Sequence, residues 1–238
     1  MKKYVNLFVF VFMIGACLSQ GRAQTKSAVS YKNPVVDIAM PDPTVIKAAD
    51  GYFYVYATES TRNVPIMKSK DLVEWTYCNT AFTNKTRPRF EPKAGIWAPD
   101  INYINGKYVL YYAMSVWGGE QTCGIGVATA NSPQGPFTDH GKMFRSNEIG
   151  VQNSIDPSLL QYEGRNYLVW GSFRGIYVIE LTTDGLSIMP GAKKKRIAGT
   201  AFEAVYIHKH DDYYYMFASI GSCCQGVKST YKVVVGRS

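Results

Sequence analysis

The sequence has few charged residues, no helical periodicity and only one long apolar run. Charged residues make up 18% of the 238 positions and hydrophobic residues 46%, so the chain can bury a core and extended disorder is not expected. No segment shows the sustained 3.6-residue pattern of an amphipathic helix. Beyond the first twenty residues no apolar stretch approaches membrane-spanning length. These absences leave an all-β fold of one large domain or two small ones.

The cysteines and the positive charge carry little functional information. The five cysteines match no zinc-ligand spacing, and the adjacent pair Cys223-Cys224 is expected to stay unbridged because neighbours in sequence bridge only with strained geometry. We therefore expect small buried thiols. The net charge is +8, but the longest basic run, Lys193–Arg196, stands alone between turn residues. It is interpreted as a solvated loop, and no nucleic-acid partner is expected.

The N-terminus has the pattern of an export signal. Lys2 and Lys3 precede an almost wholly apolar run from Tyr4 to Leu18, and small residues follow before Gln24. This predicts a signal peptide over residues 1–23 and a mature domain over 24–238. Ile14–Cys17 also resembles a bacterial lipoprotein box, so a lipid on Cys17 is the alternative and the only membrane attachment expected. The protein is predicted to be exported: periplasmic, secreted or lipid-anchored at the cell surface.

A repeat organises the mature chain. Four tyrosine-rich segments each begin at a turn residue: 51–60, 106–115, 164–173 and 211–220. In each repeat an acidic residue comes first, then a short apolar strand, and then the tyrosine-rich segment. The acids are Asp42, Asp100, Asp156 and Glu203. Their spacings are 58, 56 and 47 residues. A period near 50 that contains about four short strands indicates a β-propeller blade. A β-sandwich with coincidentally similar strands explains the repeat less well.

The repeated acids suggest a chemistry. The first strand of each propeller blade lines the central channel, so acids at the same end of these strands should converge on one mouth. Carboxylates that share a pocket repel one another, which spreads their pKa values. A glycosidase needs such a spread, because one carboxylate must stay ionised as a base while another stays protonated as an acid.

The motifs around these acids resemble those of glycoside hydrolase family 43. The matching segments are Met40–Thr44, Trp97–Asp100, Ser154–Ser158 and Phe202–Ala204. Ile220–Ser238 is most similar to the endo-acting arabinanase branch, and the likeness covers about Tyr31 to Ser238. The resemblance implies a five-bladed propeller, of which this sequence holds about three complete blades and part of a fourth. We therefore expect a C-terminally truncated chain that is weakly stable or inactive alone, whereas the longer parent protein is expected to be active.

The resemblance also implies roles for individual residues. Asp42 matches the general base, Glu203 the general acid, and Asp156 the carboxylate that orients the acid and raises its pKa. The implied mechanism inverts configuration, with the base and the acid roughly 6.5–9.5 Å apart. Candidate substrate-binding residues are Trp97, Asn153, Phe202 and Asp100. For Trp97 the alternative is packing between blades, and for Asp100 it is a structural hydrogen-bonding role.

The implied substrate is α-1,5-linked L-arabinan, within plant cell-wall arabinan or arabinoxylan. An exo-acting α-L-arabinofuranosidase or β-xylosidase and a non-catalytic carbohydrate-binding propeller are the alternatives. Family arabinanases often hold a calcium ion near the channel through a histidine of a later blade. No metal ligand is assigned here, although His208 and His210 share one strand face. Trp117 is expected in a loop over the cleft or in a packed turn.

Overall fold

The computed structural model describes residues 30–238. The chain divides into Met1–Tyr31 and one compact unit, Lys32–Ser238. The predicted signal peptide and Cys17 lie outside the described residues. No helix among the residues that are described has the length and apolar character needed to cross a membrane.

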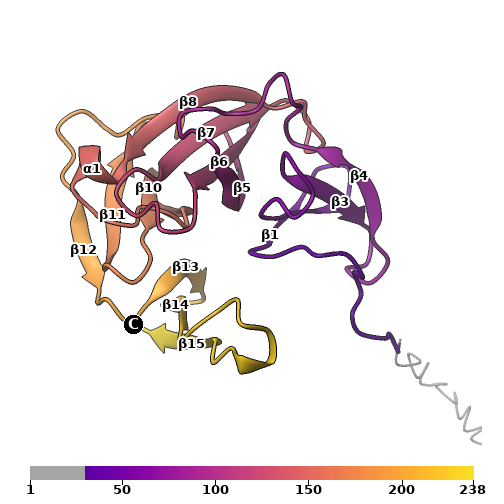
Figure 1. Cartoon of the computed structure of the whole chain (residues 1–238). Coiled ribbons are helices and arrows are strands. Elements are labelled where there is room, and N and C mark those ends of the chain that lie inside the picture. Colours follow the sequence, from indigo (N-terminus) through magenta and orange to yellow (C-terminus); the bar gives the residue numbers. More distant parts are fainter. Residues whose placement is uncertain (1–29) are drawn as a thin grey trace, which may run out of the picture. The chain divides into compact units, whose positions relative to one another are not determined.

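Lys32–Ser238 folds into four antiparallel sheets, each an up-and-down meander in chain order (Figure 1). The first sheet holds β1 (Thr44–Lys47), β2 (Phe53–Tyr56), β3 (Pro65–Ser69) and β4 (Thr76–Thr80). The second holds β5 (Gly95–Ile104), β6 (Lys107–Ser115), β7 (Gly124–Ala130) and β8 (Thr138–Arg145). The third holds β9 (Ser158–Tyr162), β10 (Arg165–Trp170), β11 (Ile176–Leu181) and β12 (Lys195–Ala198). The fourth holds β13 (Glu203–His210), β14 (Tyr213–Ile220) and β15 (Lys232–Arg237).

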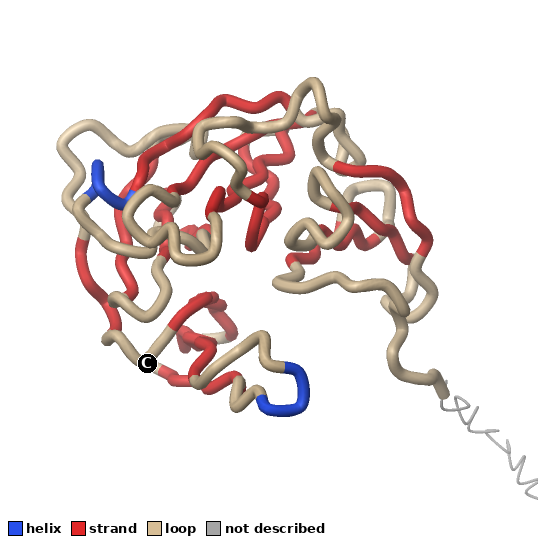
Figure 2. Tube along the Cα trace, viewed as in Figure 1, coloured by secondary structure: helices blue, strands red, loops and turns tan. Residues whose placement is uncertain are grey.

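Helices are short among the described residues. They are α1 (Ser146–Ile149) and the 3₁₀ turn η1 (Gly226–Lys228), which stand out from the strands in Figure 2. The prediction of an all-β chain built from propeller blades is confirmed, with four sheets in the described part.

Tight turns join the first two strands of the middle sheets. Asn105-Gly106 and Glu163-Gly164 each place two consecutive residues at positive φ, 48° and 80° in the first pair and 48° and 74° in the second. Two such residues make the turn whose twist matches the strands of a hairpin. The glycine that opens these repeat segments is therefore required by the turn.

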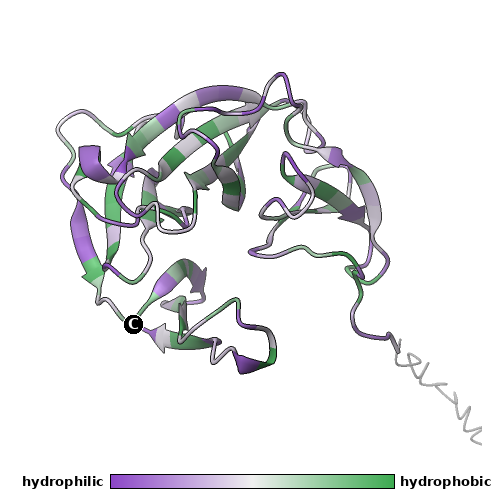
Figure 3. Ribbon diagram, in the orientation of Figure 1, coloured by the Kyte–Doolittle hydropathy of each residue, from purple (hydrophilic) through white to green (hydrophobic). Residues whose placement is uncertain are grey.

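Apolar cores lie between neighbouring sheets. Strand β1 lies beside β5, β5 beside β9, and β9 beside β13, so the first strands of successive sheets are adjacent. One buried cluster joins the first and second sheets around Tyr56, Ile96 and Tyr112. A second joins the next pair around Trp170, and a third joins the last pair around Val205. The outer strands β8 and β12 are largely hydrophilic (Figure 3).

The second half of the basic run begins a strand, which corrects its interpretation as a loop in part, whereas Lys193 and Lys194 lie in the loop before that strand. Lys195 and Arg196 pair with Val178 and Tyr177 as the start of β12. This is the outer edge of the third sheet, and both side chains are exposed. Positive side chains on an edge strand discourage pairing with another chain, so the run has a structural explanation.

The fourth sheet has three strands within the described residues, and its last strand presents apolar side chains to solvent. Val233 and Val235 on β15 are 66% and 58% exposed, and Phe217 on β14 is 38% exposed. The comparable strands of the second sheet are buried. This outer face of the fourth sheet therefore differs from the interior faces of the other sheets.

The strand register corrects one feature of the repeat. Thr44, Asp100, Ser158 and Tyr206 occupy the same register position, opposite Tyr56, Tyr111, Val169 and Phe217. Asp100 is therefore equivalent to Thr44 and Ser158, and lies two residues beyond the position of Asp42 and Asp156. At that earlier position the second and fourth sheets carry Ala98 and Ala204. The four acids do not share one structural position.

Candidate active site

One cavity of about 920 Å³ lies where the first strands of the four sheets meet, and all four sheets contribute to its wall. Ligand pockets in proteins commonly span about 300–1,000 Å³, so it can hold several sugar rings. Its lining includes all four acids singled out from the repeat, Asp42, Asp100, Asp156 and Glu203. Acids separated by up to 161 sequence positions thus face one space.

Asp42 lies on the exposed side of the cavity. It directly precedes β1 and adopts φ 49°, a left-handed conformation that aspartate tolerates better than most residues. The Thr58 hydroxyl donates a 2.5 Å hydrogen bond to its Oδ2. Thr58 Oγ1 in turn accepts a 2.7 Å bond from the backbone N–H of Ala98. This chain of bonds fixes the orientation of a carboxylate that remains in contact with solvent.

Glu203 is, with Asp100, one of the two buried acids at the cavity. It is the first residue of β13 and only 8% exposed. The Ser172 hydroxyl donates a 2.6 Å hydrogen bond to its Oε2, and the two residues also form a backbone bridge between the third and fourth sheets. A bulge separates Glu203 from Tyr206 in the pairing with β14. Bulges re-aim side chains, and here the bulge lies next to the carboxylate.

Asp156 is a carboxyl group with a strongly raised pKa. It precedes β9 with φ 57°. Desolvation raises its pKa well above the usual range, and the nearby charges of Glu203 and then Asp42 raise it further. The raised pKa of Asp156 therefore reflects its electrostatic interaction with both of the other carboxylates.

Asp100 is bonded to protein groups at the wall of the cavity. It is 6% exposed, and its Oδ2 accepts hydrogen bonds from the Leu159 N–H at 2.8 Å and from Asn102 Nδ2 at 2.7 Å. Burial raises its pKa to about 6, against the lowering effect of these bonds and of Thr44. The bond to Leu159 ties the second sheet to the first strand of the third.

The candidate substrate-binding residues divide into two groups. Trp97 and Asn153 line the cavity. Phe202 is absent from the lining and packs against the core between the third and fourth sheets, which corrects its assignment as a substrate contact. Trp117 also lines the cavity, is 78% exposed, and lies 5.5 Å from Trp97 between ring centroids. Trp97 is half-buried, so the two tryptophans form a partly exposed aromatic surface beside the acids, which suits the face of a sugar ring.

Several wall residues were not found from the sequence. Ser172 and Phe173 come from the end of the third repeat segment and Tyr231 precedes β15; all three line the cavity. Burial raises the pKa of Tyr231, and its hydrogen bond with Glu203 contributes to the rise. No motif in a single sequence distinguishes these residues from ordinary strand residues.

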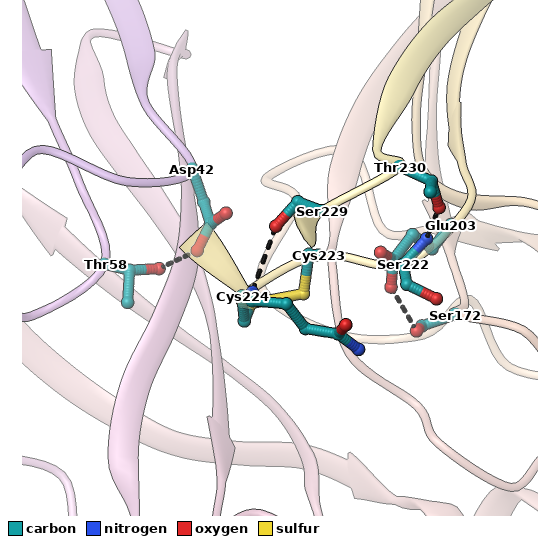
Figure 4. The surroundings of a disulfide bond; sticks show 10 residues. Asp42, Thr58, Ser172, Glu203, Ser222, Cys223, Cys224, Ser229 and Thr230 are labelled. Carbon is teal, nitrogen blue, oxygen red and sulfur yellow. Dashed lines mark hydrogen bonds between the residues drawn. A yellow bond between two sulfur atoms is a disulfide. The ribbon is translucent and has the colours of Figure 1, made fainter. Parts of the chain in front are cut away.

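The adjacent cysteines also line the cavity, and they are bonded to each other. Cys223 and Cys224 form a disulfide, with their Cα atoms 3.8 Å apart. The expectation of two free thiols was wrong. Figure 4 shows the disulfide between Asp42 on one side and Glu203 with Ser172 on the other.

The described residues do not fit a metal centre. Among residues 30–238, no three His, Cys, Asp or Glu side chains are grouped so that they could hold an ion. His208 and His210 are exposed on β13, and His210 contacts Asp211 at 3.6 Å.

The fold and the site define a β-propeller with an acidic cavity at the meeting point of its blades. Comparison with known families makes the assignment specific. The family described as Glycosyl hydrolases family 43 matches residues 31–238. The chain belongs to this family.

Individual relatives agree with this assignment. The chain is 37% identical over 211 residues to the extracellular endo-α-(1→5)-L-arabinanase 1 of Bacillus subtilis, covering 83% of this chain and 64% of the relative. It is 34% identical to an extracellular exo-α-(1→5)-L-arabinofuranosidase of Cellvibrio japonicus, covering 83% and 63%. The solved structure of Cellvibrio cellulosa α-L-arabinanase complexed with arabinohexaose superimposes with a TM-score of 0.75 at 30% identity. That match covers 84% of this chain and 71% of the solved one. The chain thus spans less than two thirds of the length of these curated relatives.

Proposed function

We propose that this protein hydrolyses α-1,5-linked L-arabinan by an inverting mechanism, with Asp42 as general base and Glu203 as general acid. The observation that carries the proposal is the single cavity in which carboxylates from three different sheets meet. The names of the curated relatives support the choice of arabinan among polysaccharides.

The geometry suits different catalytic roles for the three carboxylates. Asp42 is exposed and held by Thr58, so it can contact and deprotonate a water molecule. Glu203 is buried and held by Ser172, so it can deliver a proton to the leaving oxygen in a water-poor environment. Asp156, whose own pKa is raised in part by the charge of Glu203, orients this acid and modulates its proton affinity.

The test is hydrolysis of linear arabinan by the wild type and by Asp42→Ala and Glu203→Ala. Each substitution should reduce kcat/KM by about two to four orders of magnitude, the usual loss for a general base or acid. Asp212→Ala and Glu74→Ala are matched controls, because both side chains are exposed and outside the cavity. Wild-type activity in Glu203→Ala would refute the proposal. Proton NMR of the first product should show the inverted anomer.

Exo-action is the second candidate, because one relative is an exo-acting arabinofuranosidase. Mixed oligosaccharides from linear arabinan would indicate endo-cleavage, which we propose as the main activity. Release of arabinose alone would indicate exo-action. Parallel assays on arabinoxylan would show whether xylan-linked arabinose is also a substrate.

We further propose that the protein is exported through a signal peptide over residues 1–23. Two curated relatives are named extracellular, which supports this. Mass spectrometry of the mature protein checks it: a chain that starts at Gln24 indicates soluble export, and a lipid-bearing Cys17 indicates anchoring. Retention of the intact N-terminus in the cytoplasm would contradict both.

We also propose that a fifth sheet covers the outer face of the fourth sheet in the complete propeller. The exposed Val233 and Val235 support this, because these side chains lie in solvent in the described chain. If a fifth sheet covers this face, the double variant Val233→Lys/Val235→Lys should lower the melting temperature, because it places charges in an apolar contact. The control Ile197→Lys on the edge strand β12 should leave the melting temperature unchanged. Equal melting temperatures for both would argue against a fifth sheet.

A further inference from the structure

A disulfide between neighbouring residues contributes little to holding a chain together. Disulfides stabilise mainly by closing loops in the unfolded chain, and the effect grows with loop length. Cys223 and Cys224 are one position apart, so their bond encloses no intervening residue. Any contribution of this bond is therefore local.

The segment around the disulfide is already closed by hydrogen bonds. Ser222 and Thr230 bind each other twice: the Thr230 N–H donates to the Ser222 carbonyl at 3.0 Å, and the Ser222 N–H donates to Thr230 Oγ1 at 3.0 Å. Beyond the disulfide, the Gln225 N–H donates to Ser229 Oγ at 3.0 Å. Figure 4 draws a bond between Ser222 and Thr230 beside the disulfide. The loop is thus fixed at its base and at its tip without help from the sulfur atoms.

The disulfide faces the cavity. Both cysteines belong to the lining that also contains Asp42 and Glu203, and Cys224 is exposed while Cys223 is half-buried. Cys224 adopts φ 68°, a conformation that few non-glycine residues use. Joining the sulfurs removes both S–H groups and constrains the two side chains to one small ring.

The resulting surface is apolar, polarizable and without a hydrogen-bond donor. It lies among carboxylates, hydroxyls and a tyrosine, all of which suit sugar hydroxyls. A furanose ring carries hydroxyls at its edges and C–H groups on its faces, so its recognition needs an apolar partner for a face. Trp97 and Trp117 can supply one such partner, and the disulfide supplies a second from the fourth sheet.

We infer that the Cys223–Cys224 disulfide is a substrate-specificity element that packs against the C–H face of an arabinofuranose ring bound between Asp42 and Glu203. This inference rests on the proposed function. It assigns the disulfide to binding of the sugar, and it assigns neither fold stability nor proton transfer to it.

The experiment compares the wild type with Cys223→Ala/Cys224→Ala and with the reduced wild type, using α-1,5-linked arabinopentaose. The double variant should raise KM about five- to tenfold, which corresponds to about 1 to 1.4 kcal/mol of lost contact, with kcat changed less than twofold. Reduction should raise KM in the same direction. The melting temperature should stay within about 2 °C, because no loop is opened. Cys78→Ala is the control, since Cys78 is a free thiol outside the cavity.

Each other outcome overturns the inference. An unchanged KM with a lowered melting temperature would show that the disulfide stabilises the fold and does not bind substrate. An unchanged KM with an unchanged melting temperature would show that it has no role in binding. A fall in kcat alone assigns the disulfide to the geometry of Glu203.

Calorimetric binding of the same pentasaccharide separates this inference from the proposed function. If the wild type binds without cleaving, and binding weakens in the double variant, the proposed function fails and the inference stands. If the wild type neither binds nor cleaves, both fail.

Discussion

Replacement of Asp100 by asparagine should stabilise the protein, and the gain should appear only as the pH rises. Asp100 is a buried carboxyl whose pKa is raised from 3.8 to about 6, chiefly by desolvation. The folded state therefore binds the proton of Asp100 more tightly than the unfolded state does. The free energy of unfolding of the wild type falls as the pH rises from about 4 to about 6, and the full loss persists above pH 6.

The magnitude follows from the shift. A displacement of about two pH units at about 1.36 kcal/mol per unit gives a loss of about 3 kcal/mol above pH 6. Asparagine cannot ionise and so avoids this loss. Its carbonyl oxygen can still accept from the Leu159 N–H and Asn102 Nδ2, as Asp100 Oδ2 does. Its amide nitrogen can donate to Thr44 Oγ1, which already interacts with Asp100.

Urea unfolding at pH 3.5 to 8, followed by the fluorescence of the buried Trp170, measures the effect. The difference between Asp100→Asn and the wild type should be near zero at pH 3.5 and reach up to about 3 kcal/mol by pH 7. Other titrating groups are common to both proteins and cancel in this difference. A difference that is constant with pH, or that falls as the pH rises, would refute the reasoning.

Asp71→Asn provides a control of opposite sign. Asp71 is exposed, and hydrogen bonds from the Glu74 and Val73 N–H groups and from Ser69 lower its pKa. The folded state therefore favours the ionised form, and its contribution to stability is lost as the pH falls through the lowered pKa. Asp71→Asn should be the less stable protein at neutral pH, and its deficit should shrink on acidification.

Three further predictions concern the cavity and its support. Glu203→Gln should lower the pKa of Asp156, because the charge of Glu203 is one cause of its elevation; a carboxyl-selective NMR titration that finds the same pKa would contradict the coupling. Arg87→Met should destabilise the fold by about 3–5 kcal/mol, because it leaves the buried Glu59 without its ionic partner; thermal unfolding measures this, and Arg87→Met/Glu59→Gln should recover part of the loss. Trp117→Ala should raise KM for arabinan about three- to tenfold through lost stacking while leaving the melting temperature nearly unchanged, because Trp117 is 78% exposed; a large drop in melting temperature would instead make it a core residue.

Much of the architecture could be predicted because the repeat is local. Each tyrosine-rich segment became the second strand of its sheet, and its opening glycine became a hairpin turn in the middle sheets. The convergence of Asp42, Asp156 and Glu203 on one cavity follows from this architecture, since each stands at the start of a first strand.

The remaining errors come from properties that a linear sequence does not carry. The shift of Asp100 by two positions within its unit became visible only from strand register. Phe202 neighbours Glu203 in sequence, yet alternation along the chain turns it toward the core. The expectation of free thiols rests on the average geometry of disulfides, whereas Cys223 and Cys224 are bonded and Cys224 adopts a left-handed conformation.

The left-handed residue two places before the register position of Thr44 recurs in all four sheets, as Asp42, Ala98, Asp156 and Ala204, with φ between 40° and 57°. The backbone therefore adopts the same conformation at four points around the cavity, and only the side chain differs. Aspartate and asparagine accept this conformation more readily than alanine does. The cavity could thus gain acidic groups by exchanges at Ala98 and Ala204, or lose them by exchanges at Asp42 and Asp156, with no change in the path of the chain.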